Sequence, residues 1–128
     1  MNEQPTPVQG VILFAHGSRD PLWRLPMEAV AARMLARFPG RAVRCAYLEL
    51  TAPDLPTAAD ELVASGVRSV TIVPMFLGVG RHVREDLPAL VAQLRERHAG
   101  VQWLLQRPVG EEDRLLDLLA ELAAGGGD

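Results

Sequence analysis

Apolar runs alternate along the chain with segments whose apolar positions recur at helical spacing. The first run, VQGVILFA at residues 8–15, is continuous and β-forming, which is typical of a strand buried on both faces. In residues 22–38, apolar side chains recur at i, i+4, i+5 and i+8 from Val30, with arginines between them. This pattern predicts a helix, and Pro26 is suited to its first turn.

The alternation continues to the end of the chain. Asp54 is suited to cap the helix that follows the second strand, and Gly66 is suited to end it. The expected segments are a strand at 42–50, a helix at 52–66, a strand at 67–76, a loop from 77 into a helix ending near 98, a strand at 100–106 and a helix at 111–124.

The resulting order, βαβαβαβα, predicts an α/β fold with a four-stranded parallel sheet and helices on both faces. Right-handed crossovers favour a flavodoxin-like strand order. With 128 residues, we expect one three-layer domain over 1–128, with its ordered core at about 10–122.

Composition limits the functions that this domain can have. The formal net charge is −3, and all 13 basic side chains are arginine, which argues against a nucleic-acid surface. The single cysteine, Cys45, allows no disulfide within the chain, as in a reducing compartment. Residues 1–10 lack the apolar core of a signal peptide, and no apolar run approaches the ~20 residues of a membrane helix. We therefore expect a cytoplasmic protein with no membrane or nucleic-acid partner.

Candidate chemistry lies where the strands end, because open parallel sheets bind ligands beyond the carboxyl ends of their strands. The side chains expected there are His16, Ser18 and Arg19 after the first strand, Glu49 at the end of the second, Arg81 and His82 after the third, and Gln106 and Arg107 after the fourth. Two of the three histidines and a carboxylate should therefore meet at one rim. The third, His98, ends a helix, where a charged imidazole complements the helix dipole, and we interpret it as structural.

His16, His82 and Glu49 form a candidate set for a divalent metal ion, because imidazole suits cobalt, nickel, iron and zinc. Taken singly, His16 is as easily a local hydrogen-bonding group in a turn, and Glu49 a solvated strand end. Their joint placement at successive strand ends favours the functional interpretation. A closed structural zinc site would instead use four protein ligands, often thiolates, and Cys45 lies within a strand.

Four segments, ILFAHGSRDP, YLELTAPDLP, VPMFLGVGRHVREDLP and RPVG, resemble in order and spacing the small CbiX-type class II chelatases. The resemblance covers about residues 10–122. It implies ATP-independent insertion of cobalt, ferrous iron or nickel into sirohydrochlorin or a related tetrapyrrole, for cobalamin- or siroheme-type biosynthesis. The metal is then a substrate, with no permanently bound cofactor. It also implies a homodimer with the macrocycle between the subunits.

The same resemblance implies that His16 and His82 bind the metal and accept the pyrrole protons, assisted by Glu49. Bases near neutrality and close to the ring centre suit this reaction. Arginines suit the carboxylates of the substrate. The residues expected to contact the macrocycle are Ser18, Arg19, Phe76, Gly80 and Arg81. Arg81 is a departure, because the resemblance leads us to expect a small residue before the histidine.

Other functions fit the sequence less well. A histidine phosphatase favours arginine before its nucleophilic histidine, where this chain has Ala15. HGSRD is not the nucleophile elbow of a serine hydrolase, and GVG lacks the third glycine of a dinucleotide fingerprint. The remaining alternative is a non-catalytic metal carrier or sensor, which needs no cleft for a large anion. A macrocycle has two faces and one rim covers only one of them, so we expect a two-fold dimer to supply the other.

Overall fold

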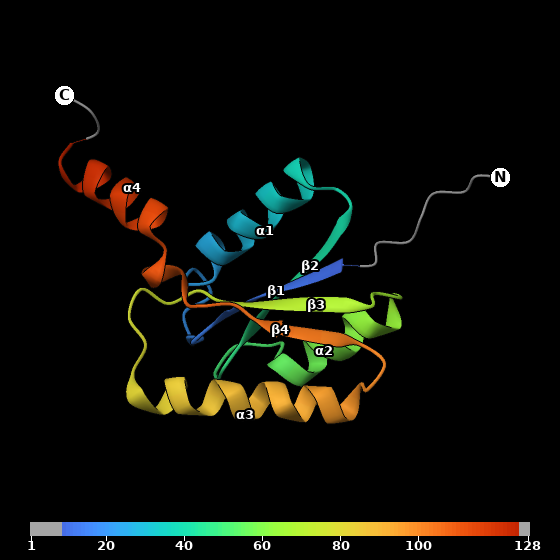
Figure 1. Ribbon diagram of the computed structural model, residues 1–128. Coiled ribbons are helices and arrows are strands. Elements are labelled where there is room, and N and C mark those ends of the chain that lie inside the picture. Colours follow the sequence, from blue (N-terminus) through green and yellow to red (C-terminus); the bar gives the residue numbers. More distant parts are fainter. Residues whose placement is uncertain (1–8, 126–128) are drawn as a thin grey trace.

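Strand β1 (Gln9–Ala15) lies between β2 (Arg41–Tyr47) and β3 (Ser69–Pro74), and β4 (Gln102–Leu105) lies at the edge beside β3. All three strand pairs are parallel, and the order is β2-β1-β3-β4. The computed structural model in Figure 1 describes residues 9–125. The predicted four-stranded parallel sheet and its flavodoxin-like order are confirmed.

The helices occupy both sides of this sheet. Helix α1 (Leu25–Arg37) covers one side, and α2 (Leu55–Ala64) and α3 (Arg81–Arg97) cover the other (Figure 1). The short 3-10 helix η1 (Val109–Glu111) leads from β4 into α4 (Asp113–Ala123).

Local signals set the helix boundaries. Asp54 caps α2 as predicted, since its side chain accepts a hydrogen bond from the Thr57 amide at 2.9 Å. Helix α2 ends at Ala64, and Gly66 follows with a φ of +102°, a conformation that favours glycine. Pro26 lies in the first turn of α1, as expected.

Alternate residues of the strands build two separate cores. Beneath α2 and α3, strands β1 and β3 contribute Ile12, Phe14, Val70 and Ile72, which are fully buried together with Trp103 of β4. A smaller cluster lies beneath α1 and contains Val11, Leu13, Ala15, Met27, Val43 and Tyr47. Strand β1 is therefore buried on both faces, which agrees with its continuous apolar sequence.

The end of β2 and the position of α4 differ from the sequence-based expectation, whereas the starts of α1 and α3 agree with it. Strand β2 ends at Tyr47, because the chain turns through Leu50, which has a positive φ of 66°. Helix α1 begins at Leu25, after a turn at residues 21–24, so it starts beside Pro26 as expected. Helix α3 begins at Arg81, after the predicted loop, and His82 lies in its first turn. Helix α4 packs on neither face of the sheet and has no buried residue within the described chain.

The expectation that residues 1–10 are not a signal peptide is not tested, because residues 1–8 lie outside the described residues. Within residues 9–125, no helix has the length and apolar character needed to cross a membrane.

Candidate functional site

The loops that follow β1 and β2 are joined by backbone hydrogen bonds. The Leu48 amide donates to the Ala15 carbonyl at 2.9 Å, and the Glu49 amide donates to the His16 carbonyl at 3.0 Å. Between them, Gly17 has a φ of +104°, and a Cβ there would lie 1.7 Å from the Glu49 carbonyl oxygen. Only glycine fits this approach, which holds His16 and Glu49 on adjacent loops.

Ser18 is held by Thr51, which reasoning from the sequence did not identify. The Ser18 amide donates to the Thr51 hydroxyl at 2.9 Å, and that hydroxyl donates to the Ser18 carbonyl at 2.7 Å. The Ser18 hydroxyl in turn accepts from the Asp20 amide at 3.0 Å. In this structure the predicted substrate contact Ser18 therefore stabilises the loop that carries His16.

The His16 ring packs against the aromatic side chain of Phe76. The imidazole is exposed to solvent, and its ring centroid lies 4.7 Å from that of Phe76 in an edge-on arrangement. Phe76 also packs edge-on against Phe14, with the ring centroids 6.2 Å apart. Only 4% of Phe76 is exposed, so its ring here supports His16 more than it offers surface to a ligand. Its predicted contact with the macrocycle remains a prediction.

The first turn of α3 presents His82 and Arg81 to solvent. Gly80 precedes this turn in an extended conformation, and within the described chain no side chain caps the helix. The first-turn amides and the helix dipole therefore favour an anion at this end. The Arg81 guanidinium pairs with Glu85 at 3.2 Å, but both side chains are highly exposed, so the pair is weak and easily exchanged.

The predicted metal set does not form a three-residue site in this chain. Among residues 9–125, no three histidine, cysteine, aspartate or glutamate side chains lie close enough together to hold a metal ion. His16 and Glu49 come from adjacent loops, whereas His82 comes from the start of α3. The arrangement offers separate imidazoles and a carboxylate at one rim, which is unlike a closed structural metal site.

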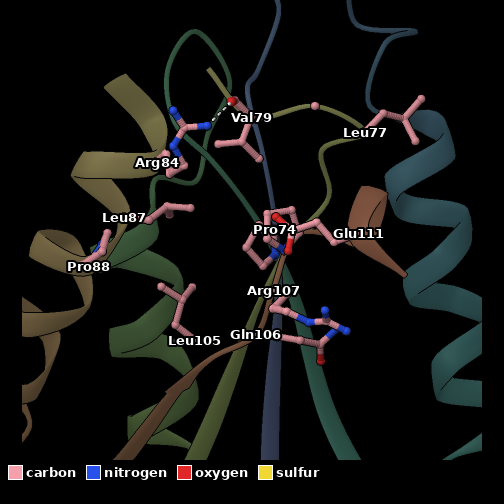
Figure 2. Close-up of a pocket in the computed structure, with 12 residues that line it drawn as sticks. Pro74, Leu77, Val79, Arg84, Leu87, Pro88, Leu105, Gln106, Arg107 and Glu111 are labelled. Carbon is pink, nitrogen blue, oxygen red and sulfur yellow. Dashed lines mark hydrogen bonds between the residues drawn. The ribbon is translucent and has the colours of Figure 1, made fainter. Parts of the chain in front are cut away.

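A cavity of about 450 Å³ lies beside these residues, between α3 and the segment that leaves β4 (Figure 2). Its walls are mostly apolar, with two arginines, Arg84 and Arg107; the Arg84 guanidinium donates to the Val79 carbonyl at 3.4 Å. His16, His82 and Glu49 do not line it. The lining residues are Pro74, Leu77, Gly78, Val79, Arg84, Leu87, Pro88, Leu105, Gln106, Arg107, Pro108 and Glu111.

The segment after β4 lines two cavities, and the sequence indicated it only through the strand end at residues 106–107 and the motif RPVG. Residues 106–108 line both this cavity and a second one of about 440 Å³ on the other side. The Gly110 amide donates to the Phe76 carbonyl at 3.0 Å. A Cβ at Gly110 would lie 1.7 Å from the Leu77 carbonyl oxygen, so only glycine allows this contact. The segment is thus locked to the loop that carries Phe76.

Groups away from the rim are structural. His98 ends α3, its Nε2 lies 2.7 Å from Asp60 Oδ1, and its ring packs near Trp103, so the structural interpretation is confirmed. Hydrogen bonds from Arg97 and His98 lower the pKa of Asp60 to about 2. Burial raises the pKa of the half-buried Cys45 thiol, which keeps it in the less reactive protonated form.

Two chelatases are similar to most of this chain. A sirohydrochlorin cobaltochelatase of Sulfolobus acidocaldarius is 29% identical over 89% of this chain and 89% of its own length. The chloroplastic sirohydrochlorin ferrochelatase of Arabidopsis thaliana is 31% identical over 86% of this chain, which spans 49% of that protein.

Solved structures share the fold. A CbiX protein from Marinobacter aquaeolei VT8 superposes with a TM-score of 0.79 at 34% identity and covers 91% of this chain and 94% of its own. The sirohydrochlorin chelatase SirB of Bacillus subtilis subspecies spizizenii has a TM-score of 0.77 at 21% identity, with 91% of this chain matching 50% of that chain. The CbiX family model matches residues 10–125, and the chain therefore belongs to the CbiX family.

Proposed function

We propose that this chain inserts a divalent metal ion into sirohydrochlorin or a closely related tetrapyrrole, without ATP. The observation that carries the proposal is the match of residues 10–125 to the CbiX family together with an exposed imidazole, His16, held at the carboxyl-terminal rim of the sheet. The metal is a substrate in this reaction. Cobalt, ferrous iron and nickel all suit imidazole and carboxylate ligands.

His16 is proposed as a metal ligand and proton acceptor. Metal entry displaces protons from the pyrrole nitrogens, so a base must lie within hydrogen-bonding reach of the ring centre. The contact with Phe76 and the backbone bonds to the Glu49 loop fix the position of the imidazole before the substrate arrives. Such preorganisation favours a reaction in which positioning supplies much of the catalysis.

His82 and Glu49 are proposed as the partners of His16. His82 lies in the first turn of α3 and is the second proposed metal ligand, and Glu49 lies on the loop bonded to His16. Their separation into different loops suits a metal that is delivered to a macrocycle. A carrier or sensor would retain its metal, and the lack of a three-ligand group in residues 9–125 favours the chelatase.

Arginines provide the proposed recognition of the substrate carboxylates. The protein has a net charge of −3, so attraction for a polyanion must come from local cations. Arg19 and Arg81 are exposed at the rim, and Arg84 and Arg107 line the adjacent cavity. Gly80 leaves the first turn of α3 open to the ring, and the apolar cavity walls suit its edge.

A homodimer in the cytoplasm completes the proposal. The rim is exposed and covers one face of a flat ring, so a second copy would supply the opposite wall. The single cysteine supports a reducing compartment.

The decisive experiment is an insertion assay on sirohydrochlorin with Co²⁺, Fe²⁺ and Ni²⁺ in parallel, followed by visible absorbance. We expect turnover with at least one metal above the uncatalysed rate, and saturation with the tetrapyrrole. Metal binding without tetrapyrrole binding or turnover would instead identify a carrier or sensor.

A further inference from the structure

Helix α4 has an apolar face that nothing in the described chain covers. Leu115, Leu118, Leu119 and Leu122 follow the i, i+3, i+4, i+7 pattern of an amphipathic helix, and acidic residues occupy the other side. Yet no residue of α4 is buried within residues 9–125, and 63% of Leu122 is exposed. The helix makes extensive contact only with η1, so its stripe needs a partner.

On the side of α1, the β3–β4 part of the sheet forms a strip without a helix over it, in which Val73 and Leu104 lie among Ser69, Thr71 and Gln102. Trp103 faces α3 and is buried, but its neighbour in β4, Leu104, is 49% exposed. In β3, Val70 and Ile72 are buried, whereas Val73 on the opposite face is only partly covered. Parallel sheets are normally covered on both faces. In the described chain, α1 covers β1 and β2 on this side and leaves β3 and β4 open.

Helix α4 is held away from its own strip. The hydrogen bond from Gly110 to Phe76 and the close approach of Gly110 to Leu77 fix the direction in which η1 leaves the sheet. Figure 1 shows α4 beyond the carboxyl-terminal ends of the strands, pointing away from β3 and β4. In this arrangement the helix does not lie on its own strip.

The strip and the helix match in size. The 11 residues of α4 span about 16 Å at a diameter of about 10 Å. The six residues of β3 and four of β4 extend about 20 Å and 13 Å, and two strands are about 10 Å wide. One helix of this length therefore fills the strip.

Their surroundings also match in charge. A helix lying on β3 and β4 is the neighbour of α1 on that side of the sheet. Helix α4 carries three acidic side chains and one basic side chain, whereas α1 carries one acidic and two basic. The two helices would attract each other once the strip is filled.

We propose that α4 is exchanged between two copies of this chain, each helix lying on the β3–β4 strip of the other. Every copy carries both uncovered surfaces and does not join them within itself in this structure, and a reciprocal two-fold pairing of two copies covers both. The inference rests on the homodimer of the proposed function and names the surfaces that form it.

Light scattering and sedimentation on three variants test this exchange. Leu122→Glu places a charge on the apolar face of α4, and Leu104→Glu places a charge on the β3–β4 strip of the sheet. Each should weaken the dimer by at least tenfold in Kd while circular dichroism shows a folded chain. Ala120→Glu, on the polar side of the same helix, is the matched control and should leave the dimer intact.

A mixture of two variants separates exchange from other arrangements. Leu122→Glu keeps an unaltered β3–β4 strip, and Leu104→Glu keeps an unaltered α4. In an equimolar mixture the unaltered helix can lie on the unaltered strip, so the mixture should form more dimer than either variant alone. A wild type that is monomeric at micromolar concentration, a Leu104→Glu variant that dimerises normally, or a mixture that gains nothing would overturn the exchange. Those three results point, respectively, to an α4 that serves another partner, to direct pairing of two α4 helices and to contact through another surface.

The insertion assay on the wild type distinguishes this inference from the proposed function. A monomer that inserts cobalt at a full rate overturns the exchange and leaves the chelatase function. A dimer that shows the expected mixing behaviour but inserts no metal supports the exchange and overturns the chelatase function.

Discussion

Strand β3 takes part in two regions of very different character. Beneath α2 and α3, Val70 and Ile72 are fully buried in a core that contains no buried polar or charged residue among those described. A few residues further on, the chain reaches the rim, where Arg81 and His82 are exposed and hydrogen bonds join one loop to the next. The same strands thus separate the residues that stabilise the fold from those proposed to act on a ligand. Substitutions should separate stability from activity in the same way.

The largest effect is expected at the rim. Replacing His16 or His82 with alanine should lower the insertion rate by about 100-fold or more, the range for loss of a general base. Because both side chains are exposed, the free energy of unfolding should change by less than about 0.5 kcal/mol. Insertion kinetics and urea denaturation of the same preparations check both statements, and rates within a few-fold of wild type would exclude the catalytic role.

Two valines of β3 sharpen the contrast between the faces of the sheet. Val70 is fully buried beneath α3, whereas Val73, on the other face, is only partly covered. Val70→Ala should reduce the free energy of unfolding by about 2–3 kcal/mol, and Val73→Ala by about 1 kcal/mol or less. Equal losses in urea denaturation would mean that both faces are equally closed.

Gly17 is a rim residue whose substitution should lower both the stability of the fold and the insertion activity. A side chain there meets the Glu49 carbonyl and must adopt a positive φ, so Gly17→Ala should cost about 1–2 kcal/mol and displace His16. We expect both stability and insertion rate to fall. Gly40→Ala, where a Cβ meets nothing within 4 Å and which lies before β2, away from the rim, is the control, and similar behaviour of the two variants would refute the packing argument.

Arg19 and Arg81 should affect one substrate and not the other. Alanine at either position should weaken tetrapyrrole binding by about 1 kcal/mol, about fivefold, because a charged hydrogen bond to a carboxylate is lost. Metal affinity should not fall, since arginine repels cations. Tetrapyrrole and metal are titrated separately. A fall in metal affinity without a fall in tetrapyrrole affinity would show that these arginines do not bind the tetrapyrrole.

The smallest expected effect is on the stability of the fold at low pH, through the contact of Asp60 in α2 with the end of α3. In the folded protein the pKa of Asp60 falls from 3.8 to about 2, because Arg97 and His98 bind its carboxylate. Its contribution to stability is therefore complete above about pH 4 and is lost as the pH falls toward 2. Asp60→Asn should flatten this part of the stability profile, measured by thermal unfolding. Glu96→Gln, at an exposed carboxylate of α3, should leave the profile unchanged.

The sequence specified the sheet well because every strand and helix has a local signal. Alternating apolar segments predicted four parallel strands, and Asp54 and Gly66 marked the ends of α2. The rim followed from the same reasoning, because the carboxyl ends of parallel strands must meet. The bond between Ser18 and Thr51 joins loops 33 residues apart, and no local pattern indicates such a contact.

Other features depend on packing, which a single chain's sequence pattern describes poorly. The stripe of leucines predicted that α4 is a helix with an apolar face, but not which surface receives it. Phe76 reads as an apolar residue near the rim, and only the fold shows that it lies under His16. The cavity beside α3 arises from the turn after β4, whose course is fixed by a glycine contact distant in sequence.

The bond between Gly110 and Phe76 links two processes that would otherwise be independent. It ties η1, which leads into α4, to the residue that packs against the His16 ring. If α4 is seated on another copy, and that copy supplies the second wall for the ring, pairing strengthens ring binding. By thermodynamic reciprocity, a ring bound at the rim then tightens the pairing of the copies by the same factor. Specific activity should then rise with enzyme concentration, and the tetrapyrrole alone should act as an assembly factor for the enzyme that modifies it.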